Sequence, residues 1–355
     1  MKYTFTISIA LILVSSVFIL DACKKSSAPP NTGNTPFNPT YINLTIPAGW
    51  PQPPTDIYAN NKLTEEGFQL GRKLFYDGRL SKDGNFPCAS CHQQFAAFAT
   101  FDHQFSHGFD NAFTRRNAPA LFNLAWMREM HFDGGINHIE VQPLAPITNI
   151  LEMAETIDNV LNKIKPDSAY KKMFAAAFGD TLINSQRMMK ALSQFMGSIV
   201  SYNSKYDQVK RGEASFDASE LAGYNTFKAK CNSCHTEPLF TDNSFRNNGL
   251  NIEPTLNDFG RMRITNDRAD SLKFKVPSLR NIVLTFPYMH DGRLFTLTQV
   301  VEHYRSNINI TQPTLDPLLR TRIPISNQER IDLIAFLQTL TDNVLLHNPR
   351  FEQPQ

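Results

Sequence analysis

Cys88-Ala89-Ser90-Cys91-His92 is the stretch of sequence that decides the fold. Two thiols three positions apart, with a histidine directly after the second, form the attachment motif of a c-type haem. The pattern returns at Cys231-Asn232-Ser233-Cys234-His235, in a chain with five cysteines. A zinc site or a redox-active cysteine pair would not require a histidine after both motifs. The sequence therefore predicts two covalently bound c-type haems, with the imidazoles of His92 and His235 binding the irons.

The composition is that of a globular protein with long loops. Of its 355 residues 41% are hydrophobic and 19% are charged, which is enough for a packed core, and two domains suit this length. The 22 prolines and 16 glycines predict long ordered loops between helices. A formal net charge of +2 argues against a nucleic acid or another polyanion as partner.

The N-terminus has the pattern of a targeting segment over residues 1–22. Lys2 supplies the positive start, and an apolar run follows from Ile7 to Leu20. At about 14 residues this run is short for a membrane span. The segment ends before Cys23 and resembles a bacterial lipoprotein signal, in which lipid is attached to that thiol. We expect an exported, periplasmic protein that is lipid-anchored to a bacterial membrane. An ordinary signal peptide or an uncleaved anchor is the alternative.

Composition and helical spacing divide the rest of the chain. Residues 23–60, rich in Pro, Asn, Thr and Ser, predict a flexible tether. Capping residues and apolar spacing predict helices that begin after Thr64, span about 168–178 and 184–209, lead into the second haem motif, and begin after Thr296 and Ser326. The predicted domains are residues 61–212, with the first haem, and 213–345, with the second, followed by a tail of residues 346–355.

Beyond the haem motifs, several segments carry a family resemblance. They are Arg116-Asn117-Ala118-Pro119, Phe132-Asp133-Gly134, Glu152-Met153, and the two runs at residues 276–281 and 287–292. Over residues 60–345 the chain resembles the bacterial di-haem cytochrome c peroxidases and their relative MauG. The resemblance implies a mainly α fold of two cytochrome-c-like domains. It also implies that peroxide reacts at the N-terminal haem, while the C-terminal haem takes electrons from a small periplasmic donor protein such as a cytochrome c.

The resemblance implies a peroxide site as well. Glu152 matches the family's glutamate over the first haem, and Gln142 matches a glutamine ten residues earlier. Splitting peroxide needs a base that takes a proton from one oxygen and returns it to the other. A carboxylate in a closed apolar pocket has a raised pKa that suits this task. His107 matches a removable iron ligand that blocks the site until the second haem is reduced, and His103 is its rival.

The family also binds one calcium ion, through neutral oxygens. Asn117, Thr285 and Pro287 match the positions that supply one side-chain oxygen and two backbone carbonyls. Such ligands, completed by water, suit the loose coordination of calcium. Family members are often dimers, so the resemblance makes a homodimer one of the expected states.

The chain departs from the peroxidases at two positions. Phe132 stands where the family often has a tryptophan between the haems, and Trp126 lies six positions earlier. Tyr304 stands where the peroxidases place a methionine on the second iron, as in MauG. Tyr304 also follows the apolar spacing of a helix after Thr296, so it points inward. Met289 is the competing ligand, because thioether ligation is common in electron-transfer cytochromes.

The sequence is therefore compatible with three functions. The first is a di-haem peroxidase that reduces hydrogen peroxide to water with donor electrons, using Glu152 as acid and base. The second is a MauG-like enzyme that oxidises a protein side chain with peroxide, which Tyr304 favours. The third is a non-enzymatic di-haem electron carrier, against which the pair Gln142 and Glu152 argues.

Overall fold

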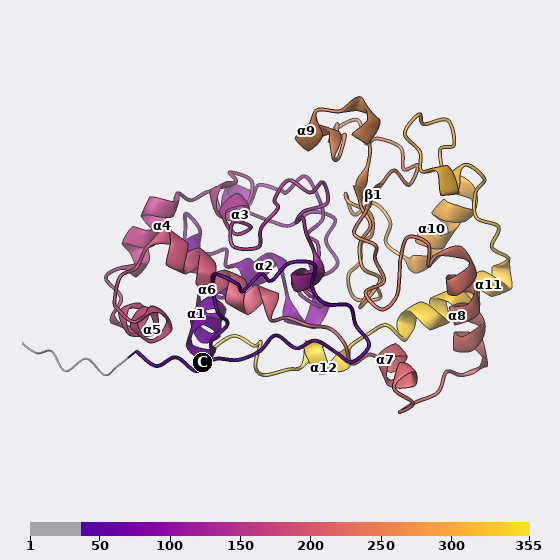
Figure 1. Cartoon of the computed structure of the whole chain (residues 1–355). Helices are drawn as coiled ribbons and strands as arrows, with labels where there is room; N and C mark the ends of the chain where they lie inside the picture. Colours follow the sequence, from indigo (N-terminus) through magenta and orange to yellow (C-terminus); the bar gives the residue numbers. More distant parts are fainter. Residues whose placement is uncertain (1–36) are drawn as a thin grey trace, which may run out of the picture. The chain divides into compact units, whose positions relative to one another are not determined.

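The structure is a computed structural model that describes residues 37–355. The targeting segment and Cys23 lie outside these residues. Residues 39–355 form one compact unit. The helices are α1 (Glu65–Phe75), α2 (Cys88–Cys91), α3 (Leu144–Thr148), α4 (Ile157–Ile164), α5 (Ser168–Phe178), α6 (Ser185–Gly197), α7 (Lys205–Lys210), α8 (Ala218–Lys230), α9 (Met262–Thr265), α10 (Leu297–Glu302), α11 (Asn327–Gln338) and α12 (Asn343–Leu346) (Figure 1).

Residues 37–355 also contain two short strands. β1 (Phe245–Arg246) pairs with β2 (Phe274–Lys275) in antiparallel register, Phe245 opposite Lys275. Most of the remaining chain forms loops, as the proline and glycine content predicted. Among residues 37–355 no helix is long and apolar enough to cross a membrane.

Several helices begin or end at the capping residues that the sequence predicted. The Thr64 hydroxyl accepts from the backbone N–H of Gly67 at 3.0 Å and begins α1. Gly179, in the left-handed conformation with φ 90°, ends α5. Ser326 and Glu329 form a reciprocal capping box that begins α11. These helix termini are confirmed.

The long helix predicted over 184–209 is wrong, because the chain leaves the helix after Gly197 and resumes as α7. Side chains from distant segments hold the intervening residues extended. Asn123 accepts from the backbone N–H of Ser201 at 2.9 Å, and Asp342 accepts from that of Tyr202 at 2.8 Å. These long-range bonds replace the helical hydrogen bonds that local spacing favoured.

Each haem motif follows a helix that packs closely on a partner helix through a glycine. A Cβ atom on Gly71 of α1 would lie 2.0 Å from the carbonyl oxygen of Ala191 in α6. A Cβ on Gly223 of α8 would lie 1.8 Å from the carbonyl oxygen of Asp332 in α11. Only glycine allows backbones to approach this closely. The two helix pairs thus form similar supports for the two motifs (Figure 1).

Two main apolar clusters surround these helix pairs. The first runs from Ile57 to Val200 and takes in Phe351 from the chain's end. The second lies within residues 206–340 and centres on Phe336, which is fully buried. The described part of the predicted tether is packed, since the Trp50 ring lies 5.2 Å from that of Trp126 and Ile57 is buried. The division into two domains stays a prediction.

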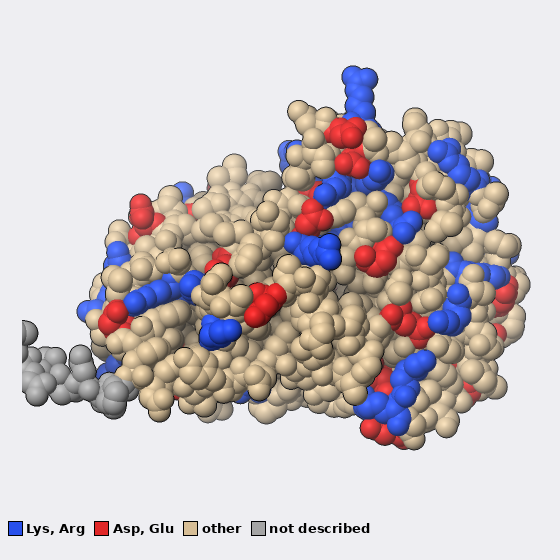
Figure 2. All heavy atoms as spheres, viewed as in Figure 1, with Lys and Arg blue, Asp and Glu red and all other residues tan. Residues whose placement is uncertain are grey.

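Two arginines from the family segments join distant parts of the chain. Arg116 donates to Asp133 and to Asp258, each at 2.6 Å. Arg280 is fully buried and donates to both carboxylate oxygens of Asp207 at 2.8 Å. A buried pair of this kind needs both partners, since either charge alone would be left unpaired. On the outer face drawn in Figure 2, basic and acidic side chains are interspersed.

Candidate functional site

One large cavity is lined by residues of both haem motifs. Its volume is about 1150 Å³, above the ~300–1,000 Å³ typical of a site for one small molecule. Cys91, Cys231 and Cys234 line it, and none of the four described cysteines forms a disulfide. Unpaired thiols from two motifs in one large cavity fit two bulky groups that are held through those thiols.

Both motif histidines are prepared in the same way to bind a metal. His92 places Nδ1 3.0 Å from the carbonyl oxygen of Phe98, and His235 places Nδ1 3.1 Å from that of Pro277. Each Nδ1–H therefore donates to a backbone carbonyl, which leaves Nε2 available as a metal ligand. Burial lowers the pKa of His92 to about 4 and also lowers that of His235. Both imidazoles are thus neutral near pH 7 and can bind iron.

Glu152 lines the cavity close to the first motif. Burial raises the pKa of the Cys91 thiol, and the charge of Glu152 adds to this rise. The Glu152 carboxyl accepts from the Asn149 amide at 2.6 Å. Burial raises its pKa, and the Asn149 bond partly opposes that rise. The carboxyl group therefore holds a proton more readily than a solvent-exposed glutamate, which suits it to proton transfer.

Gln142 also lines this part of the cavity and is bound to a residue that the sequence did not single out. Its Oε1 accepts from Nε2 of His131 at 2.8 Å. Burial lowers the pKa of His131, which makes the imidazole neutral near pH 7. Because His131 lies eleven positions from Gln142 in a loop, no periodicity indicated their contact.

His107 does not line the cavity in this conformation. Its ring is exposed and lies 4.6 Å from the ring of Phe113. Its backbone is nevertheless close to the site, because the carbonyl oxygen lies 4.0 Å from Sγ of Cys91 and the next residues pack on the Glu152 segment. The rival His103 is also exposed and lies beside Asp102. Iron ligation by His107 stays a prediction.

Tyr304 and Met289 both line the cavity, from different segments. The helix that was predicted through Tyr304 ends as α10 at Glu302 and continues as a π-helical turn, His303–Asn307. Such turns often occur at functional sites. Burial raises the pKa of Tyr304 to about 12, and the second pair of cysteines adds to this rise. Tyr304 is therefore close to the second motif.

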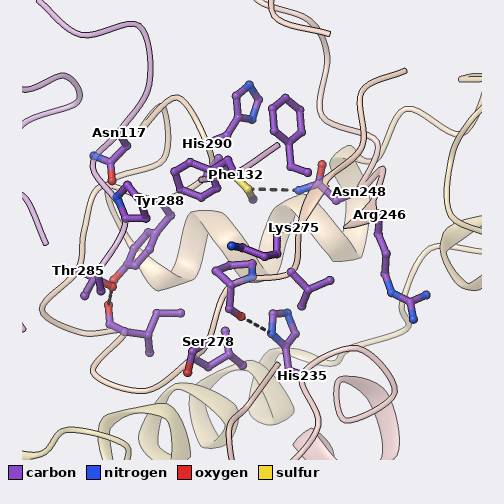
Figure 3. A pocket seen from close by; sticks show the side chains of 18 of the residues that line it. Asn117, Phe132, His235, Arg246, Asn248, Lys275, Ser278, Thr285, Tyr288 and His290 are labelled. Atoms are coloured by element: carbon purple, nitrogen blue, oxygen red, sulfur yellow. Dashed lines mark hydrogen bonds between the residues drawn. The ribbon is translucent and has the colours of Figure 1, made fainter. Parts of the chain in front are cut away.

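The three residues that the resemblance assigns to calcium all line the cavity. Asn117 donates its amide N–H to the carbonyls of His103 and Gln104, at 3.1 and 3.3 Å, so its side-chain oxygen faces the other way. Figure 3 shows Asn117 and Thr285 on one side of the pocket, and Pro287 lines it too. Within residues 37–355 no three acidic, histidine or cysteine side chains converge on one point. Calcium binding stays a prediction.

Two cations and one aromatic residue complete the walls. Lys275 lines the cavity (Figure 3). Burial lowers its pKa to about 8, and its Nζ donates to the Glu129 carbonyl at 2.5 Å. Arg246 lines the cavity near Cys234. Phe132 lines it as well, whereas Trp126 is buried in the first cluster and donates its indole N–H to the carbonyl of Pro51. Sequence reasoning missed both cations.

Comparisons with known proteins identify the relatives. The family model described as "Di-haem cytochrome c peroxidase" matches residues 65–215. The MauG methylamine utilization protein of Methylophilus methylotrophus is 34% identical over 296 residues, which cover 81% of this chain and 85% of the relative. The cytochrome c551 peroxidase of Nitrosomonas europaea is 33% identical over 296 residues, which cover 81% of this chain and 82% of the relative.

A solved structure has a similar fold. It is the crystal structure of a MauG-like protein associated with microbial copper homeostasis, with a TM-score of 0.80 and 32% identity, covering 88% of this chain and 99% of that one. The mainly helical fold thus matches a di-haem enzyme fold over most of its length, and the relatives' names divide between peroxidase and MauG. The chain therefore belongs to the family of di-haem cytochrome c peroxidases and MauG, which are peroxide-using oxidoreductases.

Proposed function

We propose that this protein is a di-haem peroxidase that reduces hydrogen peroxide to water with two electrons from a small periplasmic donor protein. The observation that carries the proposal is Glu152, a carboxyl with a raised pKa that lines the cavity close to the first haem motif. An electron carrier would need no proton-transferring group at this position.

The residues of both motifs fit two haems. His92 and His235 would bind the irons through Nε2, and the four motif cysteines would hold the porphyrins through thioether bonds. Lys275 and Arg246 would face the haem carboxylates. When bound, the haem irons supply the one-electron chemistry that no side chain of this chain provides.

The protein side chains manage protons and position the substrate. Glu152 takes a proton from one oxygen of hydrogen peroxide and returns it to the other oxygen, which leaves as water. Its bond from Asn149 holds the carboxylate in place. Gln142, fixed by His131, offers its amide N–H to the bound peroxide. The overall reaction consumes hydrogen peroxide, two electrons and two protons and yields two water molecules.

The experiment mixes the haem-loaded protein, in its ferric and in its half-reduced state, rapidly with hydrogen peroxide, for the native chain and for Glu152→Gln. We expect the native protein to react and then to oxidise a reduced small cytochrome c, and the variant to lose this turnover. Equal rates for the two proteins would contradict the role of Glu152. A native protein that leaves peroxide untouched in both its ferric and its half-reduced state would contradict the peroxidase function itself.

A second candidate is a MauG-like enzyme that oxidises a protein side chain with peroxide. The position of Tyr304 in the cavity close to the second motif favours it, because a phenolate ligand stabilises oxidised iron. The outward position of His107 agrees with it. Such an enzyme would form an oxidised state of the protein that persists after the peroxide is consumed. Reduced cytochrome c would reduce this state only slowly.

Three further properties belong to this proposal. They are a lipid anchor on Cys23, which places the protein in the periplasm at a bacterial membrane, one calcium ion at Asn117, Thr285 and Pro287, and a homodimer. Mass measurement of the membrane fraction tests the first, metal analysis tests the second, and light scattering of the purified protein tests the third.

A further inference from the structure

Two candidate ligands for the second iron reach the same cavity. Tyr304 comes from the π-helical turn, and Met289 comes from the loop that follows β2. Met289 has a φ of 75°, in the left-handed region that a residue with a side chain rarely adopts. Something in the fold must decide which of these two side chains binds the iron.

The side chain of Asn248 contacts Met289 and lines the same cavity as Tyr304. Its Nδ2 donates to the sulfur of Met289 at 3.3 Å, as the dashed line in Figure 3 shows. Its Oδ1 accepts from the backbone N–H of Leu250 at 3.2 Å, which fixes the orientation of the amide. The Asn248 amide also opposes the rise that burial causes in the pKa of Tyr304. Because the amide has two N–H groups, it can donate to the Met289 sulfur and to the Tyr304 oxygen at the same time.

The backbone of Asn248 is fastened to the turn that bears Tyr304. The carbonyl of Asn248 accepts from Nε2 of His303 at 3.0 Å, and the His303 ring packs edge-on against that of Tyr304 at 5.2 Å. The next residue, Gly249, accepts from the backbone N–H of Asn309 at 2.9 Å. Asn248 is therefore anchored to this turn through its backbone and to the loop of Met289 through its side chain.

We propose that Asn248 is a positioning residue that selects Tyr304 over Met289 as the ligand opposite His235. The N–H bond to the thioether sulfur uses one of its two lone pairs and holds the Met289 side chain against Asn248. The second N–H of the amide stabilises the negative phenolate oxygen of Tyr304. The inference rests on the proposed di-haem site and deepens it, because phenolate ligation favours ferric iron, whereas methionine ligation raises the reduction potential.

The test uses the full-length, haem-loaded ferric protein and reads the ligand directly. Methionine bound to ferric haem gives a near-infrared charge-transfer band that phenolate does not give. We expect no such band in the native protein. In Asn248→Leu we expect the band to appear and the reduction potential of the second haem to rise, while the spectrum of the first haem is unchanged.

Two further variants keep the result interpretable. Asn248→Asp keeps the size of the side chain and its acceptor for Leu250 but loses both N–H donors, so it should also gain the band. The double variant Asn248→Leu, Met289→Leu should not gain it, because the thioether is gone. Asn251→Ala is the matched control, since its exposed side chain contacts Asn309 on the surface and should leave the spectrum unchanged.

The outcomes separate two failures. A native protein that already shows the methionine band would overturn the assignment of Tyr304 and with it this inference, yet the peroxidase function would stand. A native protein without the band, together with Asn248→Leu and Asn248→Asp variants that load haem and keep the native spectrum and potential, would overturn the role of Asn248 alone.

Discussion

The same Cys-x-x-Cys-His motif is placed opposite two different walls of one cavity. Close to the first motif the wall supplies groups that handle protons, chiefly Glu152. Close to the second motif it supplies two candidate iron ligands, Tyr304 and Met289. Both motif histidines have the same carbonyl-bonded Nδ1, so the attachment side does not distinguish the two centres. Any difference in chemistry between the two proposed haem centres must therefore come from the opposite walls.

The largest effect is expected at the first wall. Glu152→Gln keeps the shape of the side chain and removes its ability to take up a proton. Since general acid–base catalysis typically contributes ~10²–10⁴-fold, peroxide reduction should slow by about that factor. Stopped-flow absorbance measures the rate. Glu140→Gln is the control, because Glu140 lies outside the cavity lining and should react at the native rate.

The spectrum of the second haem sharpens this result. If the walls act separately, Glu152→Gln should leave that spectrum and its reduction potential as in the native protein. A variant that changes the second haem as strongly as the first would show that the walls are coupled, and the comparison between them would fail.

The next effect is expected at the second wall. Tyr304→Phe removes the phenolic oxygen, so the second haem should lose the ligand that favours ferric iron. Its potential should rise on the order of 0.1 V, within the ~0.8 V that axial ligands span. Potentiometric titration followed by absorbance measures this. An unchanged potential would mean that Tyr304 is a core tyrosine with no bond to iron.

A smaller effect is expected from Asn149, whose amide favours the charged form of Glu152. Asn149→Ala removes this bond and raises the pKa of Glu152 further. Because the base must be ionised to react, the acid limb of the rate profile should move to higher pH. At pH values on that acid limb the variant should react on the order of tenfold more slowly than the native protein. At high pH the two rates should converge.

A pH series of peroxide reaction rates measures this profile. Thr148→Ala is the matched control, since its hydroxyl bonds only to the backbone of α3 and does not line the cavity. A profile of Asn149→Ala that is lowered equally at every pH would point to a displaced loop and not to the ionisation of Glu152.

The sequence predicted the parts of the fold that local rules decide. Thr64, Gly179 and Ser326 mark helix ends because capping depends on neighbours within a few positions. The break after Gly197 was missed, because Asn123 and Asp342 lie far away in sequence. Local spacing has no information about such bonds.

In the functional site, too, the sequence predicts the parts that depend on neighbouring residues, and misses those that depend on distant contacts. The haem motifs are contiguous and were predicted from the residues alone, whereas Glu152 and Tyr304 needed the family resemblance. Asn248 and His131 were missed because their importance lies in contacts to Met289 and Gln142, which the fold brings together. A single sequence gives no sign of a positioning residue that acts through another side chain.

The smallest effect is expected at His107, and it decides how the first wall is closed. The ring is exposed on the outside of the cavity, while the backbone is held by packing of Gly108 against the Glu152 segment, where a Cβ would lie 2.2 Å from the carbonyl oxygen of Leu151. A ligand role would require this packed loop to turn over. If the observed conformation persists, His107→Ala should change the ferric reaction rate by no more than about twofold, as for other surface substitutions.

Rapid mixing of peroxide with ferric and with half-reduced protein tests this directly. We expect the native ferric protein to react promptly, and His107→Ala to match it. If the native protein reacts only after half-reduction and the variant reacts in both states, His107 binds the first iron and the loop must open. The first wall would then have a ligand of its own, and the two walls would differ in whether the ligand can leave, rather than in whether one exists.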